Sequence, residues 1–346
     1  LSKGETPMKF DVVIGNPPYQ EEAQGTSTSD DPIYYKFMDE AYKIAEKSIL
    51  ITPARFLFNA GKTPKNWNKK MLSDEKIKVS FYEQKSANVF PGTDIKGGVA
   101  ITYRDETKIF GEIGTFTSFT ELNSLLKKVE NRNDFQSIMS IIYTQSKFNL
   151  DALYRDFPHY EGIIGSNGRD KRLRKPILGR LDVFSQEDQG ECYKILGRLN
   201  NERVYRYIPR KYIESHPNLL SYKVIVPAAN GSGSIGEVLS TPLIGSPLIG
   251  FTDTFISFGS FETQIEAEAL LKYIKTKFAR AMLGVLKITQ DNTRDKWAKV
   301  PLQDFTSSSD IDWSQSVAEI DAQLYKKYGL SQEEIDFIES KVREMD

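Results

Sequence analysis

Four consecutive residues near the start of the chain, Asn16-Pro17-Pro18-Tyr19, combine groups that could hold an aromatic amine. The Asn16 side-chain oxygen can accept one N–H, and the Pro17 carbonyl a second, because consecutive prolines stiffen the backbone and fix its direction. Two acceptors let positive charge develop on a poor nucleophile, such as the amine of adenine, while it takes a methyl group. The Tyr19 ring offers a face for stacking a base drawn out of a duplex. The pattern favours methylation of a base amine over its alternative, a plain Pro-Pro turn capped by Asn16.

The elements that must position this loop follow from the apolar pattern around it. Residues 10–15 (FDVVIG) predict a buried strand that ends at the loop, and residues 33–47 carry apolar side chains at helical spacing. Further buried strands are predicted at residues 48–52, 77–82 and 98–103, and the polar stretch 21–31 predicts a mobile loop. Strands alternating with helices predict an α/β sheet with helices on its faces.

The pattern changes near residue 110. From there to about residue 258 the chain has short β-like runs with frequent Gly and Pro, which predict a separate, irregular, β-rich domain. Residues 261–287 predict one long helix. Ser331 and Glu334 form a capping box that opens a last helix.

Composition limits the kinds of chemistry available. The 346 residues carry a net charge of −1, so DNA binding would require basic residues gathered on one face. The single cysteine, Cys192, excludes an internal disulfide and a multi-cysteine zinc site, and fits a reducing cytoplasm. His159 and His216 both adjoin prolines and are predicted to be loop residues, so no metal site is expected. No apolar run approaches the roughly 18 residues that span a bilayer, so no membrane partner is expected.

Several segments together resemble the γ-class adenine-N6 DNA methyltransferases of restriction–modification systems, TaqI-like enzymes and their larger relatives with a specificity domain. Asn16-Pro17-Pro18-Tyr19 is similar to the catalytic motif IV of that family. Residues 49–58 (ILITPARFLF) resemble the family's next strand and its Pro-x-Arg turn. Val89-Phe90-Pro91-Gly92, leading through Lys96-Gly97-Gly98 into a strand, resembles motif VIII. The resemblance is close over roughly residues 8–105 and looser beyond.

The resemblance implies a fold, a function and roles for these residues. The expected fold class is α/β, with a partial Rossmann-like methyltransferase sheet, then an irregular β-rich or α+β target-recognition domain and C-terminal helices. The implied domains are residues 1–110 (C-terminal part of the catalytic domain), 111–310 (target recognition) and 311–346 (helical tail). The implied reaction is methyl transfer from S-adenosylmethionine to adenine N6 in a site-specific manner. Tyr19 would stack on the flipped adenine and Phe90 would pack against it, whereas for Lys96-Gly97-Gly98 a close approach to DNA and a simple turn both remain open.

The cofactor-binding segments of the family precede the catalytic loop, yet only fifteen residues precede Asn16 here. We therefore expect an incomplete S-adenosylmethionine pocket, with the missing part before Leu1. Gly231-Ser-Gly233-Ser-Ile-Gly236 matches the dinucleotide fingerprint, but Pro242, Gly245, Pro247 and Gly250 follow it, so the helix that the fingerprint requires is not expected. A flexible loop is favoured over a permuted cofactor site.

Two basic stretches are candidates for binding DNA. Clustered cations near aromatic rings suit contacts with phosphates, and an Arg side chain can recognise guanine through two hydrogen bonds. The first stretch contains Arg169, Lys171, Arg172, Arg174 and Lys175 against one acid, Asp170. The second contains Arg198, Arg203, Arg206, Arg210 and Lys211, interleaved with Tyr205, Tyr207 and Tyr212, and from it Arg206 and Arg210 are the leading candidates. The alternative for both is a solvated charged surface.

The leading hypothesis is thus a DNA methyltransferase whose partner is duplex DNA, within a restriction–modification enzyme that has an endonuclease domain or subunit upstream. One alternative is a DNA-specificity module without activity of its own. Another is a methyltransferase acting on RNA or on protein glutamine, since Asn-Pro-Pro-Tyr also suits those amine and amide targets. A monomer or loose assembly is expected.

Overall fold

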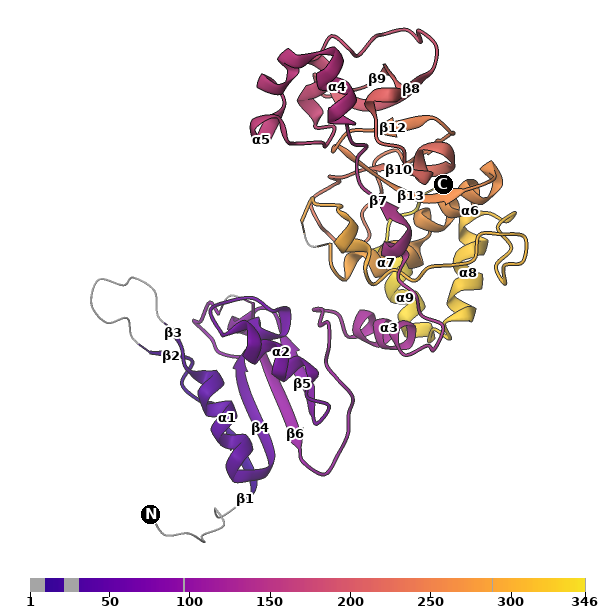
Figure 1. Ribbon diagram of the computed structural model, residues 1–346. Coiled ribbons are helices and arrows are strands. Elements are labelled where there is room, and N and C mark those ends of the chain that lie inside the picture. Colours follow the sequence, from indigo (N-terminus) through magenta and orange to yellow (C-terminus); the bar gives the residue numbers. More distant parts are fainter. Residues whose placement is uncertain (1–9, 22–30, 96, 288, 346) are drawn as a thin grey trace. The chain divides into compact units, whose positions relative to one another are not determined.

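The computed structural model describes residues 10–21, 31–95, 97–287 and 289–345, which fall into two compact units, residues 1–123 and 124–346 (Figure 1). Each unit is described by itself. Most of the polar stretch 21–31, together with Lys96 and Leu1, lies outside the described residues. The units divide after Asn123, where the sequence predicted a change near residue 110, and residues 311–346 are part of the second unit. The roles assigned to the three predicted domains stay predictions.

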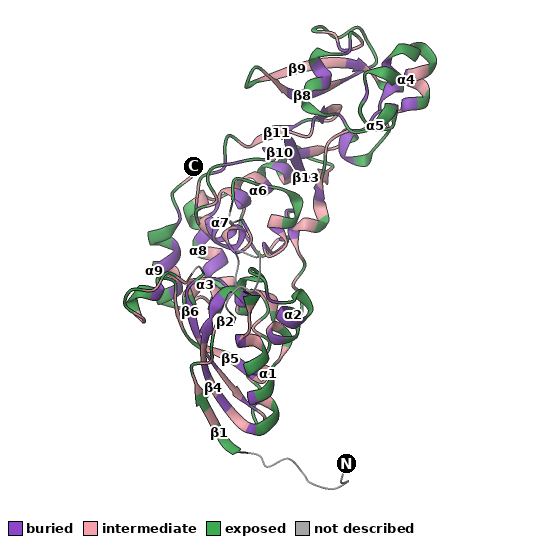
Figure 2. Ribbon diagram, turned by 90° about the vertical axis from the view of Figure 1, so that its left-hand side faces the viewer, coloured by how far each residue is buried: buried purple, intermediate pink, exposed green. Residues whose placement is uncertain are grey.

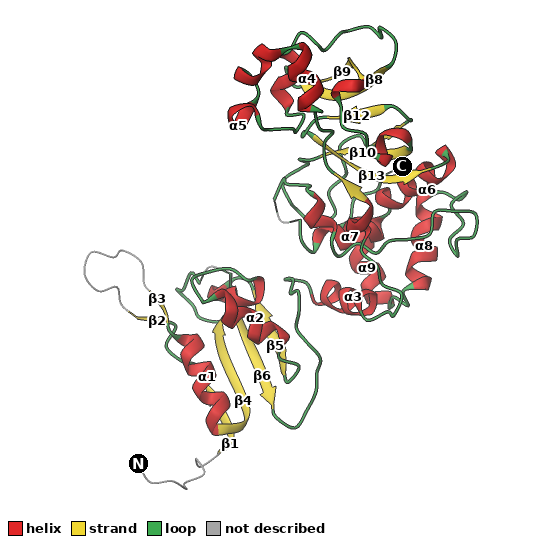
Figure 3. Ribbon diagram, viewed as in Figure 1, coloured by secondary structure: helices red, strands yellow, loops and turns green. Residues whose placement is uncertain are grey.

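The first unit is built on a four-stranded sheet with the order β1-β4-β6-β5 (Figure 3). Its elements are β1 (Phe10–Gly15), β2 (Gln20–Glu21), β3 (Asp31–Pro32), α1 (Tyr34–Ile44), β4 (Ala45–Pro53), η1 (Ala54–Phe58), α2 (Lys65–Ser73), β5 (Ile77–Glu83), η2 (Ser86–Asn88) and β6 (Val99–Asp105). Strand β1 runs parallel to β4, whereas β6 is antiparallel to both of its neighbours. The strands predicted at residues 48–52, 77–82 and 98–103 are confirmed.

Helices α1 and α2 pack with the sheet in one apolar core that includes Met38, Leu50 and Trp67. The Trp67 ring meets the rings of Tyr34 and Phe56 edge-on, with centroids 6.3 and 5.3 Å apart. Burying a side chain such as Met38 contributes about 1.5–3 kcal/mol to stability. The unit therefore has a rigid base on which the loops at the ends of its strands are mounted.

The helix predicted over residues 33–47 is too long. Helix α1 ends at Ile44 and the chain enters β4 directly at Ala45, whose φ and ψ are −133° and 148°. Lys47 pairs with Val12 on one side and Asp105 on the other. Pairing in the sheet thus overrides the local helical pattern, and neither Gly nor Pro marks the change in the sequence.

The strand predicted at residues 10–15 forms, but it is not buried within the described residues. Phe10, Val12 and Ile14 are 50 %, 44 % and 73 % exposed, because β1 is an edge strand that pairs only with β4 among the described strands. Figure 2 shows the exposed residues along β1 beside the buried stretch of β4. The predicted burial was wrong because a run of apolar residues indicates a strand but not the number of strands that pair with it.

The second unit contains two sheets, a compact lobe of short helices and a helical end. After α3 (Thr120–Glu130), which spans the boundary, its elements are η3 (Ile138–Ile141), β7 (Ile142–Tyr143), α4 (Leu150–Asp156), η4 (Pro158–Gly162), α5 (Gly165–Gly168), η5 (Lys175–Gly179), β8 (Cys192–Leu199), β9 (Glu202–Pro209), η6 (Arg210–Tyr212), η7 (Pro217–Leu220), β10 (Tyr222–Pro227), β11 (Leu243–Gly245), β12 (Ile249–Phe251), β13 (Phe255–Phe261), α6 (Gln264–Lys275), α7 (Lys277–Gly284), η8 (Arg294–Trp297), α8 (Val317–Lys327) and α9 (Gln332–Lys341). The sheet orders are β11-β10-β13-β7 and β12-β8-β9.

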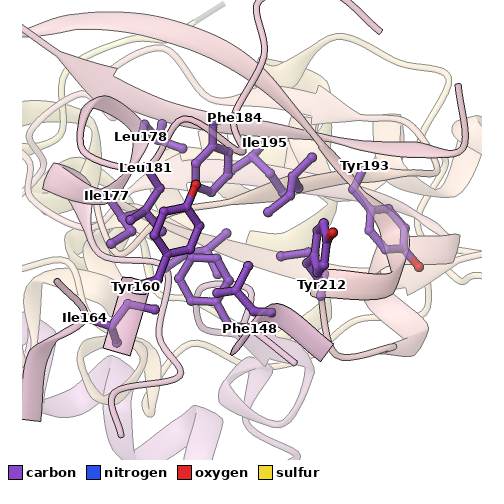
Figure 4. Close-up of a cluster of buried hydrophobic side chains, with 14 of the residues drawn as sticks. Phe148, Tyr160, Ile164, Ile177, Leu178, Leu181, Phe184, Tyr193, Ile195 and Tyr212 are labelled. Atoms are coloured by element: carbon purple, nitrogen blue, oxygen red, sulfur yellow. The ribbon is translucent and has the colours of Figure 1, made fainter. Parts of the chain in front are cut away.

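The lobe formed by residues 148–219 has a core of its own. Side chains from α4, η4, η5, β8, η6 and the segments between them gather there, among them Phe148, Tyr160 and Phe184 (Figure 4). Tyr160 donates its hydroxyl hydrogen to Asp182 and accepts one from the Val183 amide. This core holds one face of the β8–β9 hairpin rigidly, through Tyr193, Ile195 and Ile208.

The single helix predicted over residues 261–287 is wrong in two respects. Phe261 ends strand β13, and the remainder divides at Thr276 into α6 and α7. Thr276 caps α7, because its hydroxyl accepts a hydrogen bond from the Ala279 amide. The capping box predicted at Ser331 and Glu334 is confirmed at the start of α9. Among the described residues, no helix is long and apolar enough to cross a membrane.

Candidate active site

The Asn16–Tyr19 loop leaves the carboxyl end of β1 and lines a cavity of about 650 Å³. Gly15 pairs with Leu50, so the loop and the end of β4 emerge at the same edge of the sheet. The lining residues are Asn16, Pro17, Pro18, Tyr19, Gln20, Pro32, Tyr34, Pro53, Arg55, Gly61, Lys62, Thr63, Asp94 and Ile95. The cavity therefore brings together three segments that the sequence singled out separately: the loop itself, the Pro-x-Arg turn and the segment that follows Phe90.

The backbone fixes the far end of the loop. The Ile33 amide donates to the Tyr19 carbonyl at 3.1 Å, and Gln20 pairs with Pro32 in the short β2–β3 ladder. With β1 at its start and this ladder at its end, the loop is anchored on both sides. Asn16 is exposed and Pro17 half-buried at the cavity.

Tyr19 is half-buried and packs against the apolar core of the first unit. Burial raises the pKa of its phenol, so the hydroxyl is neutral at physiological pH. Within the described residues that hydroxyl is buried and has no hydrogen-bond partner. A buried donor without a partner destabilises a fold by about 1–3 kcal/mol. The packing around Tyr19 therefore stabilises its aromatic ring, whereas its hydroxyl lowers the stability of the fold.

The cavity is also lined by residues that the sequence patterns did not indicate, among them Tyr34 and Thr63. Tyr34, the first residue of α1, is buried, and this burial raises its pKa to about 12 despite the opposing effects of a hydrogen bond with Thr63 and the charge of Arg55. The Thr63 hydroxyl in turn donates to Asn68 Oδ1 at 2.7 Å. No motif marks Tyr34 or Thr63, since both reach the cavity through the packing of α1 and α2.

A buried serine shapes the third segment. Ser86 Oγ donates to the Thr93 carbonyl at 3.1 Å and accepts from the Ile95 amide at 2.8 Å. These two bonds hold the turn that brings Asp94 and Ile95 to the cavity. No sequence pattern marks Ser86, because its partners Thr93 and Ile95 lie seven and nine residues further along the chain.

Phe90 lies in the same segment but is not among the residues that line the cavity. It is half-buried, and its amide donates to the Ser86 carbonyl at 2.8 Å. Its predicted contact with a flipped base therefore stays a prediction. Gly98 has a φ of +77°, and a Cβ there would approach the Glu83 carbonyl to 2.2 Å. That close approach is to the protein itself, which favours the turn interpretation at Gly98.

Several cations predicted to contact DNA are already engaged within the protein. Arg172 and Arg174 each donate through Nε to Asp170, at 2.7 and 2.5 Å, and these bonds hold the pKa of that carboxyl well below its usual range. Lys171 pairs with Glu214 at 2.7 Å.

The two candidates in the second basic stretch donate to backbone carbonyls. Arg206 donates to the Tyr205 carbonyl at 2.8 Å, and Arg210 donates to the Cys192 carbonyl at 3.4 Å. By contrast, Arg169 and Lys175 are exposed and have no carboxylate partner in the described part of the chain.

The glycine-rich loop at residues 231–236 is occupied by the protein's own carboxylate. Glu237 accepts from the amides of Ser232 and Gly233, at 2.7 and 3.1 Å, and lies 3.3 Å from Lys287 Nζ. Burial alone would raise the pKa of Glu237, but these partners together lower it to about 2. Residues 237–242 form no helix, so the prediction that no helix opens after Gly236 is confirmed.

Within the described ranges, no group of three or more His, Cys, Asp or Glu side chains is placed to hold a metal ion. His216 caps η7 by accepting from the Asn218 amide, and burial lowers its pKa. His159 is an exposed residue of η4.

Comparison with known proteins relates the front of the chain to methylases. Residues 2–90 match the family described as Eco57I restriction-modification methylase. Over 141 residues the chain is 30 % identical to an uncharacterized adenine-specific methylase of Mycoplasma pneumoniae, an alignment that covers 38 % of this chain and 32 % of that protein. The chain thus spans about a third of the curated relative that it matches. The front of the chain is thus similar to methylases, among them a family described as restriction-modification methylases.

Two solved structures are similar at lower levels. The type IIG restriction endonuclease BpuSI aligns with a TM-score of 0.34 and 11 % identity, over 96 % of this chain and 54 % of that one. The type IIL restriction-modification enzyme MmeI, solved in complex with DNA, aligns with a TM-score of 0.34 and 8 % identity, over 95 % and 56 %. TM-scores of this size do not establish a shared arrangement.

Proposed function

We propose that this chain is part of a site-specific DNA methyltransferase of a restriction–modification system, which transfers a methyl group from S-adenosylmethionine to adenine N6 in duplex DNA. The observation that carries the proposal is the cavity of about 650 Å³ lined by Asn16, Pro17, Pro18 and Tyr19, together with Asp94 and Ile95. The methylase relationship of residues 2–90, which include all of these except Asp94 and Ile95, supports it.

The proposed chemistry follows from the groups at the loop. The side-chain oxygen of Asn16 and the carbonyl of Pro17 accept the two hydrogens of the adenine amine, which favours the transition state in which that nitrogen gains positive charge. The Tyr19 ring stacks on the extruded base and offsets part of the unstacking cost of a few kcal/mol. Because Tyr19 is neutral at physiological pH, it adds no charge beside the base.

The resemblance implies that binding elements for S-adenosylmethionine lie ahead of Asn16, where the described residues form β1 alone. The amides of Ser232 and Gly233 in the glycine-rich loop are bonded to Glu237. When bound, S-adenosylmethionine would supply the methyl group, while this chain's residues orient the amine.

The segment from 53 to 63 gives the cavity its charged rim. Arg55, Lys62 and Asp94 line it, and Lys62 Nζ also lies 2.9 Å from Asp31 Oδ1. The lining therefore carries charge of both signs, and the choice between a nucleic acid and a protein glutamine rests on the competition experiment below.

The proposal is tested by measuring labelled methyl transfer from S-adenosylmethionine by the complete natural protein to duplex DNA, RNA and protein acceptors in direct competition. We expect label in duplex DNA, on adenine N6 after digestion to nucleosides. Label in RNA or in protein glutamine would shift the function to those targets. Sequence-specific DNA binding with no transfer to any acceptor would leave a DNA-specificity module.

A further inference from the structure

The β8–β9 hairpin presents a row of cations on one face of its sheet. In the antiparallel ladder Lys194 lies opposite Tyr207, and Arg198 lies opposite Arg203. Since alternate side chains of a strand share a face, Lys194, Leu196 and Arg198 of β8 lie on the same side as Arg203, Tyr205 and Tyr207 of β9. We call Lys194, Arg198 and Arg203, with Tyr205 and Tyr207, the hairpin cation face.

The arginine pair at one end of this face is unfavourable on its own. Like charges directly opposite in an antiparallel ladder destabilise it, and burial together with the charge of Arg198 lowers the pKa of Arg203. Neither arginine has a carboxylate partner in the part of the chain that the structure describes. Glu202 pairs with Leu199, so it belongs to the other face of the hairpin. The repulsion between the two arginines is thus not offset by any acid of the described residues.

The two arginines differ in their remaining contacts. Arg203 Nη2 donates to the Thr241 carbonyl and hydroxyl, at 2.8 and 2.7 Å, and its guanidinium lies over the Phe255 ring. Arg198 Nε is buried and has no hydrogen-bond partner among the described residues. Arg203 is therefore fixed in place by hydrogen bonds, whereas Arg198 Nε makes none with the described residues.

The lysine at the other end is held by aromatic rings rather than by an acid. Lys194 Nζ lies 4.4 Å from the Tyr205 ring centroid and 5.9 Å from that of Tyr207. A cation over an aromatic face keeps its full charge. Between the two ends of the row, on the same face, Leu196 is buried in an apolar cluster with Phe251 and Phe255. This packing fixes the middle of the row, so the cations lie at its two ends.

We propose that the hairpin cation face binds the phosphate backbone of duplex DNA. This inference rests on the proposed function and deepens it, because it adds to Arg169 and Lys175 a row of cations that no acid of the described residues neutralises. Four residues along a strand separate Lys194 from Arg198, or roughly 13 Å. That distance exceeds the spacing of about 3.4 Å per phosphate along one DNA strand, so the two cations reach different phosphates.

Backbone contacts carry no sequence information, so this face contributes affinity and register rather than choice of site. Each phosphate contact adds about 0.9 to the slope of log binding constant against log salt concentration. Removing Lys194 and Arg198 together should therefore flatten the slope by about 1.8. Removing the charge of Arg198 also relieves the repulsion with Arg203, so the melting temperature should stay the same or rise.

The test measures binding of the complete protein to a duplex oligonucleotide of arbitrary sequence across a series of salt concentrations. The wild type is compared with K194Q/R198Q and with the matched control K326Q, which removes an exposed charge from α8. We expect the flatter slope only in K194Q/R198Q, and a melting temperature for R198Q at or above that of the wild type.

The other possible results distinguish a failure of the hairpin cation face from a failure of the proposed function. If the wild type binds DNA and K194Q/R198Q has the same salt slope, the hairpin cation face is not a phosphate site, and the proposed function stands. If R198Q lowers the melting temperature while the slope is unchanged, the arginine is structural. If K326Q flattens the slope equally, only net charge matters and the inference fails. If the wild type binds no duplex DNA at any salt concentration, the proposed function itself fails.

Discussion

Two loops of this chain carry sequences that suggest ligand binding, and the structure treats them differently. The Asn16–Tyr19 loop is anchored by backbone pairing at both ends and leaves its side chains at a cavity. The glycine-rich loop at residues 231–236 turns its amides onto Glu237, which Lys287 contacts from the other side. Both motifs have polar groups suited to a ligand, but only in the first are those groups left available by the fold.

The same distinction divides the basic residues. Arg172 and Arg174 share Asp170, and Lys171 is paired with Glu214. Lys194 and Arg198 have no such partner within the described residues. A motif or a charge run thus indicates which groups a chain has, whereas tertiary contacts decide which of them can act on another molecule.

The largest expected effect is on the first loop. Asn16→Ala removes one of two acceptors for the amine, so methyl transfer should fall by about 100- to 1,000-fold. Since Asn16 is exposed, the melting temperature and DNA affinity should change little. Single-turnover transfer measured beside DNA binding checks this, and an active Asn16→Ala protein would remove the residue from the mechanism.

The second loop should respond in the opposite way. Glu237→Gln breaks a largely buried pair with Lys287, which should cost about 3 kcal/mol of unfolding free energy. Methyl transfer by the folded protein should be unchanged. Denaturant unfolding at neutral pH, with transfer assayed below the transition, checks both expectations.

The acid sensitivity of this loop has a defined sign. The pKa of Glu237 in the folded protein is about 2, below its ordinary value of 4.5, so ionisation of this carboxyl stabilises the fold above pH 4.5. That contribution is lost as the pH falls from 4.5 toward 2. The stability difference between wild type and Glu237→Gln should therefore shrink across this window, and a constant difference would contradict the assigned ion pair.

The ring of Tyr19 should support methyl transfer, whereas its hydroxyl should only lower the stability of the fold. Tyr19→Ala removes base stacking worth about 1–3 kcal/mol, so transfer should fall about 10- to 100-fold. Tyr19→Phe keeps the ring and removes a buried hydroxyl that has no partner in the described residues, so activity should persist and stability should rise by up to about 1 kcal/mol. Loss of activity in Tyr19→Phe would show that the hydroxyl takes part.

The smallest effect is expected at the paired arginines. Asp170 already offsets part of the charge of Arg172 and Arg174. The variant R172Q/R174Q should therefore flatten the salt slope of DNA binding by less than the value of about 1.8 for two free contacts. The same titration used for K194Q/R198Q checks this, and an equal change in both variants would contradict the distinction between paired and unpaired cations.

The local features of this fold are readable from the sequence. The strand positions, the loop at Asn16 and the capping box at Ser331 depend on residues close together in the chain, and all are found where predicted. Glu334 lies three residues after Ser331, so a single turn of helix contains the whole interaction.

Features set by distant contacts were not readable in the same way. The predicted helices 33–47 and 261–287 were too long, because sheet pairing at Lys47 and the cap at Thr276 ended them. Ser86 and Thr63 reach the candidate site through packing, and no spacing in the sequence marks them. The sequence shows that an acid, Asp170, lies close to Arg172 in the chain, but it does not show the hydrogen bond between them.

The central claim is that the groups of the Asn16–Tyr19 loop act on adenine in DNA. The most direct measurement is modification-sensitive sequencing of DNA from cells expressing the complete natural protein, with wild type beside Asn16→Ala at equal protein levels. We predict that one recurring DNA sequence carries N6-methyladenine in cells with the wild type and lacks it in cells with the variant. A motif methylated equally in both, or no motif in either, would contradict the claim.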